Sequence, residues 1–421
     1  MTIEQIYKAF LECDSISTDT RKINSGCMFF ALKGDNFNGN MFALEALKKG
    51  ASYVIIDEKQ YAKHDHCILV ENVLHTLQAL ATHHRKKLDI PIIALTGSNG
   101  KTTTKELINA VLSTTYKTSA TKGNLNNHIG VPLTLLEFKA DTEIGIVEMG
   151  ANHQKEIEFL SNIALPDYGL ITNFGKAHLE GFGGIEGVIK GKSELYDHLK
   201  SHQKTIFVND NDQTQIEQIG NYKKVIRFGS NMKMLSAQPF VVLQFNKIKI
   251  VTHLTGAYNY NNIAVAIAVG GYFKVDDDSI SKTIANYIPS NNRSQIIEKG
   301  SNQIILDAYN ANPTSMMAAL DNFGNLNSSE KVAILGDMFE LGEASHMEHQ
   351  SISDYSQKFD INNIFLVGKL FFETVNHSDK IKRFKSFEDL KTELANNPLN
   401  NKYLLIKGSR GMALERVLDV L

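Results

Sequence analysis

The sequence predicts an α/β protein of three domains with mostly parallel sheets. Short apolar runs alternate with amphipathic stretches of helical length, which is the pattern of βα units. A chain of 421 residues is long enough for two to four domains at roughly 150 residues each. Because the βα pattern is found three times along the chain, we expect domains at residues 1–85, 86–290 and 291–421.

The composition limits the classes of protein to which the chain can belong. Lys and Arg total 44 and Asp and Glu total 46, which gives a formal net charge of -2. That charge excludes electrostatic capture of nucleic acid or of an anionic membrane as the main activity. No apolar run reaches the roughly 18 residues of a membrane span, and the N-terminus lacks the basic start of a signal peptide. We therefore expect a cytoplasmic protein without a membrane span.

The cysteines point to a reducing compartment. Cys13, Cys27 and Cys67 include no C-x-x-C pair, and three thiols cannot all pair with one another. This pattern argues against a disulfide framework and against a zinc knuckle. We expect the three side chains to be buried as small hydrophobic groups.

The first predicted domain is a small α/β unit. Residues 3–11 carry apolar side chains at helical spacing. Apolar runs at residues 27–32 and 52–57 predict strands, and the amphipathic stretch 42–50 lies between them. The periodic segment 71–88 predicts a helix that closes the domain.

The second predicted domain opens with a strand, a turn and an amphipathic helix over residues 91–113. The residues of the turn and of the start of the helix are Gly97, Ser98, Asn99, Gly100, Lys101, Thr102 and Thr103. Backbone N–H groups in such a turn bind anions, Lys101 can neutralise terminal phosphates, and Thr102 can ligate Mg²⁺. Leu95 replaces the first glycine of the usual G-x-x-x-x-G-K-[ST] pattern, so this is a shortened P-loop.

The alternative interpretation of this turn is a chance G-K-T tripeptide. The strand before it and the helix after it favour phosphate binding, with ATP or GTP as the nucleotide. The N-K-x-D pattern of GTPases is absent from the sequence. Further apolar runs at residues 143–150, 168–175 and 204–210 predict the other strands of a central parallel sheet.

Three further residues are candidates for chemistry next to the P-loop. Glu148 ends a predicted strand at the carboxyl edge of the sheet, where it could hold Mg²⁺, or it could be a helix cap or a surface acid. His178 follows another strand and could bind a second cation, or it could be a hydrogen-bonded loop residue. Lys192 lies in the amphipathic stretch 184–199, where its context alone predicts a solvated helix lysine.

A polar segment at residues 288–300, which contains Pro289, predicts a hinge or domain boundary. After it, four apolar runs are each followed by a helix-like stretch, which predicts a Rossmann-like, doubly wound domain. These runs are residues 303–309, 331–337, 363–368 and 403–409.

Over nearly its whole length the chain resembles the Mur ligase family, ATP-dependent amide-bond-forming enzymes of peptidoglycan synthesis. LTGSNGKTTT resembles the P-loop of the family, VEMG its magnesium-binding glutamate, and NFGKAHLE its metal-binding histidine. GKSELY resembles the segment whose lysine is carbamylated in the family. The resemblance therefore implies a central ATPase domain that binds ATP and two Mg²⁺ ions. It also implies that Lys101, Glu148, His178 and a carbamylated Lys192 are catalytic.

Within the family, other segments resemble the members that join D-alanyl-D-alanine to UDP-N-acetylmuramoyl-tripeptide. These segments are STDTRKINSGCMFFALKG, KGNLNNHIGVPLTLL, LDAYNANP, LGDMFELGE and IKGSRGMALERV. The D-N-P-R tetrapeptide, frequent in the related ligase that adds a dibasic residue, is absent. No motif distinguishes lysine from diaminopimelate as the third residue of the tripeptide. No motif marks an oligomer interface either, and we expect a monomer.

The resemblance also implies roles for individual residues. For the uridine nucleotide it implies Thr18, Asp19, Thr20 and Arg21, with Asn38-Gly39-Asn40 where the family often has Asp-Gly-His. For ATP it implies Asn259 and Asn262 at the adenine, Arg293 at the phosphates and Asp307 at the ribose. Asn259 and Asn262 could instead cap the helix that they begin. For the peptide substrates it implies Asn126, Asn127, Asn310, Asn312, Asp337, Glu340, Ser409 and Arg410.

Three hypotheses for the function follow. In the first, the tripeptide carboxylate attacks the γ-phosphate of ATP, and the dipeptide amine then attacks the resulting acyl phosphate. The second is the folylpolyglutamate synthetase branch of the same superfamily, against which the N-terminal STDTR segment argues. The third is a switch protein that hydrolyses ATP only to change shape; it explains the P-loop but gives the outer domains no substrate pockets.

Overall fold

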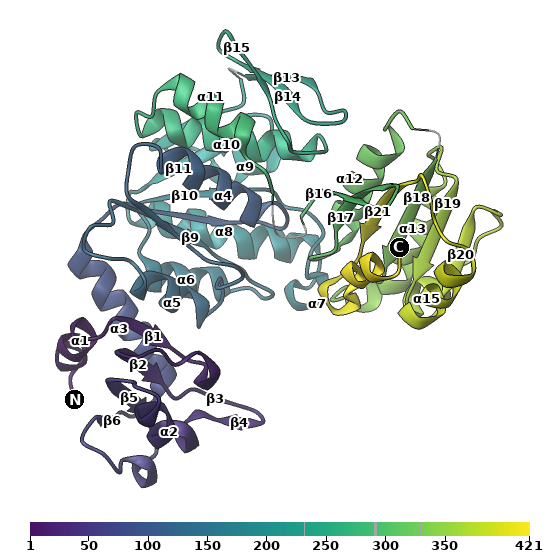
Figure 1. Cartoon of the computed structure of the whole chain (residues 1–421). Helices are drawn as coiled ribbons and strands as arrows, with labels where there is room; N and C mark the ends of the chain where they lie inside the picture. The colour runs from purple at the N-terminus through teal and green to yellow at the C-terminus, as the bar shows by residue number, and fades with distance from the viewer. Residues whose placement is uncertain (231, 290–292, 329) are drawn as a thin grey trace.

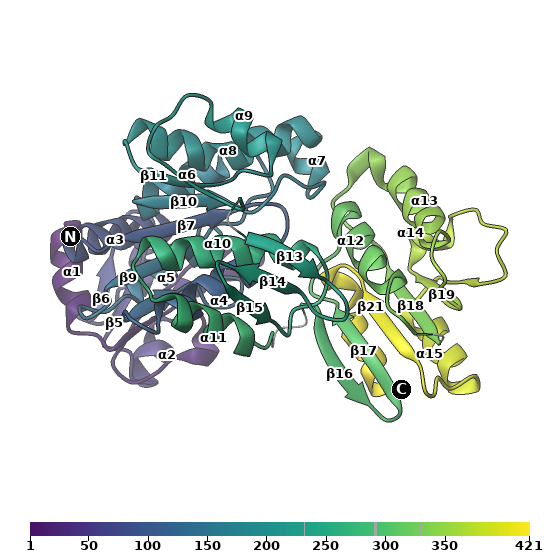
Figure 2. The same ribbon diagram turned by 90° about the horizontal axis from the view of Figure 1, so that it is seen from above.

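Three mostly parallel sheets follow one another along the chain in the computed structural model, which describes residues 1–230, 232–289, 293–328 and 330–421. Figure 1 shows them in an N-terminal part (purple), a central part (blue to green) and a C-terminal part (green to yellow). Figure 2 shows the C-terminal part beside the central part. The predicted α/β fold with parallel sheets is therefore confirmed.

The N-terminal part is a four-stranded parallel sheet in the order β1-β2-β5-β6. Its strands are β1 (Ser15–Ser17), β2 (Cys27–Phe30), β5 (Tyr53–Ile56) and β6 (Cys67–Leu69). Its helices are α1 (Ile3–Leu11), α2 (Ala43–Lys48) and α3 (Val73–Leu88), and a hairpin pairs β3 (Lys33–Gly34) with β4 (Phe37–Asn38). The expected strands are β2 and β5, whereas the short strands β1 and β6 were not predicted.

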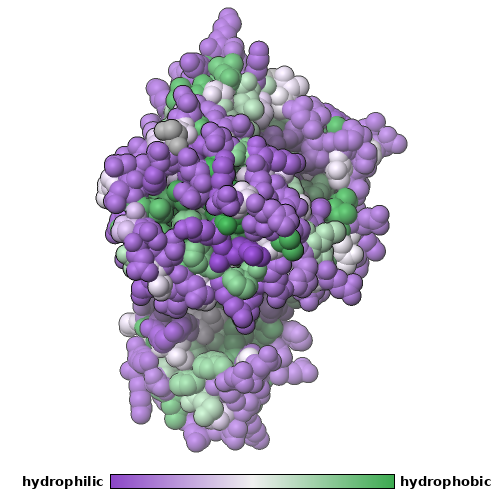
Figure 3. Space-filling model, turned by 90° about the vertical axis from the view of Figure 1, so that its right-hand side faces the viewer, coloured by the Kyte–Doolittle hydropathy of each residue, from purple (hydrophilic) through white to green (hydrophobic). Residues whose placement is uncertain are grey.

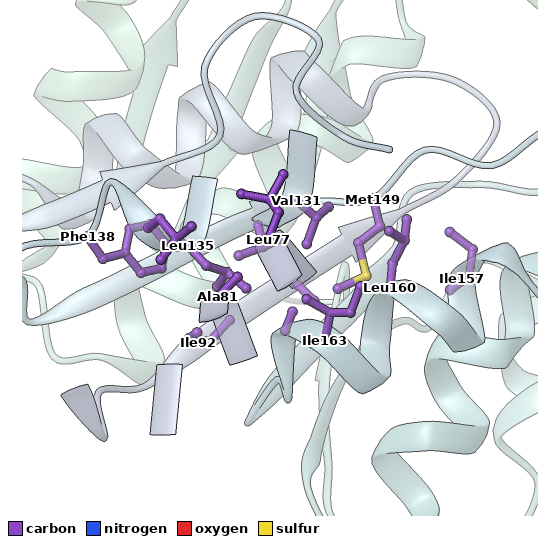
Figure 4. Close-up of a cluster of buried hydrophobic side chains, with 14 of the residues drawn as sticks. Leu77, Ala81, Ile92, Val131, Leu135, Phe138, Met149, Ile157, Leu160 and Ile163 are labelled. Atoms are coloured by element: carbon purple, nitrogen blue, oxygen red, sulfur yellow. The ribbon is translucent and has the colours of Figure 1, made fainter. Parts of the chain in front are cut away.

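Helix α3 joins the N-terminal part to the central part. It begins at the Asn72 cap, whose side chain accepts a hydrogen bond from the His75 N–H (2.8 Å). Figure 4 shows Leu77 and Ala81 of this helix in one buried cluster with Val131 and Leu135 of the central part. Each fully buried leucine contributes about 1.5–3 kcal/mol, so these contacts fix the helix on the central sheet. The expected domain boundary after residue 85 falls inside this continuous helix.

The central part is a six-stranded parallel sheet in the order β12-β11-β10-β7-β9-β8. The strands are β7 (Ile92–Thr96), β8 (Thr118–Ala120), β9 (Ile144–Glu148), β10 (Tyr168–Ile171), β11 (Thr205–Asn209) and β12 (Val225–Phe228). Around it lie α4 (Lys101–Leu112), α5 (Gly130–Leu136), α6 (Glu156–Ala164), α7 (Leu179–Phe182), α8 (Ile185–Ser201), α9 (Gln213–Ile219), α10 (Tyr258–Tyr272) and α11 (Asp277–Asn286). Every residue of β7 and β9 is buried, which explains why both read as continuous apolar runs.

A small antiparallel sheet of β13 (Met232–Ser236), β14 (Val242–Phe245) and β15 (Ile248–Val251) follows the central sheet. The sequence analysis did not predict it. Its strands are half exposed, so their apolar residues alternate with polar ones and form no conspicuous run. The expected hinge at residues 288–300 includes residues 290–292, which lie outside the described part of the chain.

The C-terminal part is a six-stranded sheet in the order β16-β17-β21-β18-β19-β20, in which only β16 runs antiparallel to its neighbour. Its strands are β16 (Gln295–Lys299), β17 (Asn302–Asp307), β18 (Lys331–Gly336), β19 (Asn363–Val367), β20 (Ile381–Phe384) and β21 (Tyr403–Lys407). Its helices are α12 (Pro313–Gly324), α13 (Ser345–Ser356), α14 (Lys369–Phe372) and α15 (Phe387–Asn396). The four predicted strands are confirmed, but the chain after β21 forms short 3-10 turns and not the expected helix.

The surface of the molecule is mostly polar, and its cysteines differ in burial. Figure 3 shows one face of the molecule, which is largely hydrophilic with hydrophobic side chains in scattered patches. Among the described residues, no helix combines the length and the apolar character needed to cross a bilayer. Cys27 is buried as expected, whereas Cys13 and Cys67 are only partly buried, and all three are free thiols.

Candidate active site

A cavity of about 1140 Å³ lies between the central and C-terminal parts. One wall, the central edge, consists of the loops that follow β7, β9 and β10, with the start of α10. The opposite wall, the C-terminal edge, consists of the loops that follow β17, β18 and β21. Ligands of open α/β sheets bind outside the carboxyl ends of the strands, and here two such edges face each other.

The P-loop forms the floor of the central edge because two of its glycines adopt conformations that other residues avoid. Gly97 has φ of 143° and Gly100 has φ of 78°, and a Cβ on Gly100 would lie 2.6 Å from Oδ1 of Asn262. Gly100 is the N-cap of α4, so the backbone N–H groups that start this helix face the cavity. The turn is held by Asn173 in the loop after β10, whose carboxamide accepts from the Asn99 N–H (3.1 Å) and donates to the Asn99 carbonyl (2.9 Å).

Lys101 lies in this floor with its ammonium group folded onto the turn. Its Nζ donates to the Gly97 carbonyl at 2.7 Å. Burial lowers the pKa of Lys101 to about 8; Glu148 opposes this shift and the positive charge of Arg293 adds to it. The site therefore holds a poorly compensated positive charge, which an anion can neutralise.

Glu148 carries an unused hydrogen-bond acceptor beside the P-loop. It is 1% exposed, and its Oε1 accepts from the Thr102 hydroxyl (3.3 Å) and from Asn126 Nδ2 (2.8 Å). Its Oε2 is buried and has no hydrogen-bond partner among the described residues. An orphaned carboxylate oxygen next to a hydroxyl is a donor set that suits Mg²⁺. Glu148 and Thr102 thus lie together, as the sequence analysis expected.

His178 and Lys192, the two residues expected at a second cation, differ in their position relative to the cavity. His178 lines the cavity, and its Nδ1 is hydrogen-bonded to the carboxylate of Glu340 on the C-terminal edge. This bond holds the pKa of Glu340 below its usual value. In the described part of the chain, no group of three or more His, Cys, Asp or Glu side chains gathers as a metal cluster.

Lys192 is 1% exposed and lies behind the cavity wall, so it is not the solvated lysine that its helix context predicts. Its Nζ donates to the carbonyl of Ala151, which does line the cavity (3.0 Å), and lies 4.7 Å from the centroid of the Phe182 ring. Burial lowers its pKa well below the usual lysine value, and the charge of Lys101 adds to the shift. The neutral amine is consequently favoured here far more than on a free lysine.

Asn259 and Asn262 line the cavity from α10 but are bonded to each other. Asn262 Nδ2 donates to Asn259 Oδ1 (2.8 Å), and Asn259 Nδ2 donates to the Thr255 carbonyl (2.8 Å). The Thr104 hydroxyl of α4 donates to Asn262 Oδ1 (3.1 Å). Neither amide caps the backbone at the start of α10, where the N-cap Ala257 makes no side-chain hydrogen bond.

Arg293 and Asp307 enter the cavity with partners that the sequence analysis missed. Arg293 stacks on the ring of Tyr309, with 3.7 Å between its guanidinium carbon and the ring centroid. Asp307 forms an ion pair with Lys407 (2.5 Å), and Lys407 is 2% exposed. A lysine inside the apolar run of β21 was the available signal, because a buried lysine requires an acceptor.

The residues expected around the dipeptide divide into two groups. Asn310, Asn312, Glu340, Ser409 and Arg410 line the cavity. Asp337 does not, because its carboxylate accepts the N–H groups of Leu370 and Phe371 and caps α14. The expectation that Asp337 contacts the dipeptide therefore has no support in this geometry.

Asn312 connects the two walls. Its side chain caps α12 by accepting from the Ser315 N–H (2.9 Å), and its Nδ2 donates to Asn99 Oδ1 of the P-loop (2.7 Å). On the central side, Asn126 and Asn127 also line the cavity. The cavity thus brings together the P-loop, the pair Asn126 and Asn127 of the central part, and Asn312 of the C-terminal part.

The residues expected at the uridine nucleotide lie in the N-terminal part, away from this cavity. Asp19 accepts two hydrogen bonds from the guanidinium of Arg21 (3.0 and 2.9 Å), which lower the pKa of Asp19 to about 2. Thr18 and Thr20 flank this pair in the sequence and are partly buried. Asn40, at the position of the family's histidine, donates to Asp57 Oδ1 (2.9 Å). The N-terminal part thus contains two polar pairs, Asp19 with Arg21 and Asn40 with Asp57.

Models of one family match three consecutive parts of the chain. The model "Mur ligase family, catalytic domain" matches residues 12–87, "Mur ligase middle domain" matches residues 95–270, and "Mur ligase, glutamate ligase domain" matches residues 292–410. The chain is 34% identical over 420 residues to the UDP-N-acetylmuramoyl-tripeptide–D-alanyl-D-alanine ligase of Bacillus subtilis (strain 168), covering 96% of this chain and 92% of that one.

Solved structures agree with this match. MurF from Acinetobacter baumannii superposes with a TM-score of 0.88 at 30% identity, covering 99% of this chain and 98% of that one. The MurF ligase of Thermotoga maritima in complex with ADP superposes with a TM-score of 0.84 at 26% identity, covering 98% and 97%.

Proposed function

The chain belongs to the Mur ligase family, and we propose that it is an ATP-dependent ligase that joins D-alanyl-D-alanine to UDP-N-acetylmuramoyl-tripeptide. One observation carries the proposal: the P-loop and the C-terminal loops face one cavity and are bonded across it through Asn99 and Asn312. A switch protein needs no such second wall. A full-length match to a ligase of this substrate class also leaves the folate hypothesis without support.

ATP lies with its phosphates at the start of α4 in this proposal. The backbone N–H groups after Gly100 and the ammonium of Lys101 receive the phosphate oxygens, which relieves the uncompensated charge of Lys101. Asn259 and Asn262 receive the adenine edge, because amides both donate and accept hydrogen bonds. Arg293 and Asp307 approach from the C-terminal edge at the phosphates and the ribose.

The chemistry proceeds in two steps. The carboxylate oxygen of the tripeptide forms a bond to the γ-phosphorus, and the bond from that phosphorus to the β-bridging oxygen breaks, which releases ADP. The amine of the dipeptide then attacks the acyl carbon, phosphate leaves with the C–O electron pair, and the amine loses a proton. Lys101 stabilises the negative charge that builds up on the phosphoryl oxygens during the first step.

Glu148 and Thr102 fit a Mg²⁺ ion, because Glu148 Oε2 is buried without a hydrogen-bond partner among the described residues. A bound Mg²⁺ supplies charge neutralisation at phosphate oxygens. His178 fits a second ion through Nε2, since its Nδ1 is held by the Glu340 carboxylate, an arrangement typical of metal-binding histidines. A carbamate on Lys192, formed when its neutral amine adds to CO₂ and loses a proton, would supply an oxygen ligand for this ion.

Each remaining part of the substrates is assigned to one part of the chain. The N-terminal part, with Asp19 and Arg21, binds the uridine nucleotide, and Asn126 and Asn127 contact the peptide that extends into the cavity. The C-terminal edge receives D-alanyl-D-alanine. We propose domain limits near residues 85 and 290 and a monomeric enzyme.

The test is phosphate release by the purified protein with ATP and Mg²⁺, with the two substrates added singly and together. We expect release only when UDP-N-acetylmuramoyl-tripeptide and D-alanyl-D-alanine are both present, with a product of the mass of the UDP-muramoyl-pentapeptide. Release that is independent of both substrates would overturn the assignment and favour the switch hypothesis.

A further inference from the structure

Two phenylalanine side chains are exposed inside a cavity that is otherwise lined mostly by polar groups. Phe159 of α6 is 44% exposed on the central edge, and Phe339, in the loop after β18, is 42% exposed on the C-terminal edge. Ligand pockets combine apolar walls with a few polar groups that fix orientation. The two rings therefore offer exposed apolar surface to hydrocarbon parts of a substrate.

The loop that carries Phe339 is held firmly. The Phe339 N–H donates to Ser409 Oγ (3.0 Å), and the N–H of the preceding Met338 donates to Nε2 of the buried His349 (3.0 Å). The Ser409 N–H donates to the Asp337 carbonyl (3.1 Å). Because these three bonds fix the backbone from Asp337 to Phe339, the position of the ring is restricted before any ligand binds.

The ring lies against the backbone of Gly411. A Cβ at Gly411 would lie 2.8 Å from Cε2 of Phe339, so this close approach requires glycine. The neighbouring Arg410 lines the same cavity and donates from Nη1 to Glu415 (2.7 Å), and its side chain is 60% exposed. An arginine has five N–H donors, so Arg410 keeps donors for a carboxylate ligand.

We propose that Phe339 sets the size of the second residue of the incoming dipeptide, an inference that rests on the proposed function. In that residue the side chain and the terminal carboxylate are attached to the same carbon atom. A dipeptide whose carboxylate binds Arg410 therefore brings this side chain to the wall formed by Phe339 and Gly411. The ring contacts a methyl group and leaves no space for a larger side chain.

The test compares kcat/KM for D-alanyl-D-alanine, D-alanylglycine and D-alanyl-D-leucine in the wild type and in Phe339→Ala. Contact of one methyl group with the ring corresponds to roughly fourfold selectivity, so the preference for D-alanyl-D-alanine over D-alanylglycine is expected to fall about fourfold in the variant. The relative kcat/KM of D-alanyl-D-leucine is expected to rise about tenfold, because the space of the ring becomes available. KM for the dipeptide changes, whereas KM for ATP does not.

Three controls make the result specific. Phe339→Leu restores an apolar wall and is expected to recover most of the selectivity. Phe159→Ala removes an equally exposed ring from the opposite wall, and Phe372→Ala removes a ring of 42% exposure outside the cavity; both are expected to leave the dipeptide ratios unchanged. Unchanged ratios in Phe339→Ala, or an equal shift in Phe159→Ala, would overturn the inference. A wild type that forms no pentapeptide would overturn the proposed function itself.

Discussion

The two walls of the cavity differ in how far their charged side chains are paired. On the central edge, Lys101 is buried with a lowered pKa and Glu148 keeps a buried oxygen without a partner among the described residues. On the C-terminal edge two ion pairs are already formed, between Asp307 and Lys407 and between Arg410 and Glu415. Unpaired buried charge is unfavourable until a ligand compensates it, whereas paired charge orients neighbouring groups. The central edge is therefore suited to the phosphoryl chemistry, and the C-terminal edge to holding the acceptor.

The largest effect is expected from removing the cation of the central edge. Lys101→Met eliminates the charge that faces the transferring phosphoryl group, and kcat should fall about 10³-fold. The free energy of unfolding should not fall, because the substitution also removes a buried charge. Phosphate release and thermal unfolding, measured on the same preparation, test both statements. A kcat of Lys101→Met close to that of the wild type would show that the charge of Lys101 does not set the central edge apart from the C-terminal edge.

A smaller loss is expected at Glu148, the carboxylate proposed to bind Mg²⁺. Glu148→Gln keeps an oxygen that can accept from Thr102 and Asn126 but loses the negative charge, so kcat should fall about 10²-fold. The affinity for ADP should become independent of Mg²⁺, as measured by titration calorimetry with and without the ion. Binding of ADP that still strengthens with Mg²⁺ would show that Glu148 does not hold the ion.

The lowered pKa of Lys101 predicts a pH dependence. Its pKa of about 8 in the folded protein lies below the usual value of a lysine, so the free site loses its positive charge as the pH rises through 8. Since phosphates bind the charged form, Kd for ADP should increase about tenfold between pH 7 and pH 9. In Lys101→Met this dependence should disappear, and its persistence there would assign it to another group.

The smallest effect is expected from the amide pair that joins the two walls. Asn312→Ser keeps a good cap on α12 but loses the donor to Asn99, a bond of about 0.5–1.5 kcal/mol, so kcat/KM should fall about threefold to tenfold. Asn325→Ser, at the exposed C-terminal end of the same helix, is the matched control and should retain full kcat/KM. A loss as large as that of Lys101→Met would mean that the C-terminal edge takes part in the chemistry.

Sequence patterns identified most of the central edge because that wall depends on the local backbone. The glycines of the P-loop and the buried runs of β7 and β9 are encoded within a few residues each, so the phosphate site and the position of Glu148 could be predicted. The half-exposed strands of the antiparallel sheet were missed because they form no apolar run. Lys192 was misjudged from its helix context because the neighbours that bury it come from elsewhere in the chain.

The C-terminal edge depends on pairings between distant segments. Asn99 and Asn312 are 213 residues apart, and Asp307 and Lys407 are 100 residues apart. Resemblance placed several of these residues near the acceptor, but it did not show that Asp337 caps α14 instead. The sequence analysis did not single out Phe339, because an isolated phenylalanine in a loop indicates a function only when it is known to be exposed in a cavity.

The sequence by itself determined the α/β class, the main strands in their order along the chain and the P-loop turn, because strand burial, helix periodicity and glycine conformation are local properties. The tertiary structure alone decided which residues face each other across the cavity, which charges are already paired and which ring is exposed to a ligand. Those properties arise when two sheets bring their carboxyl edges together, and no short stretch of residues encodes that approach.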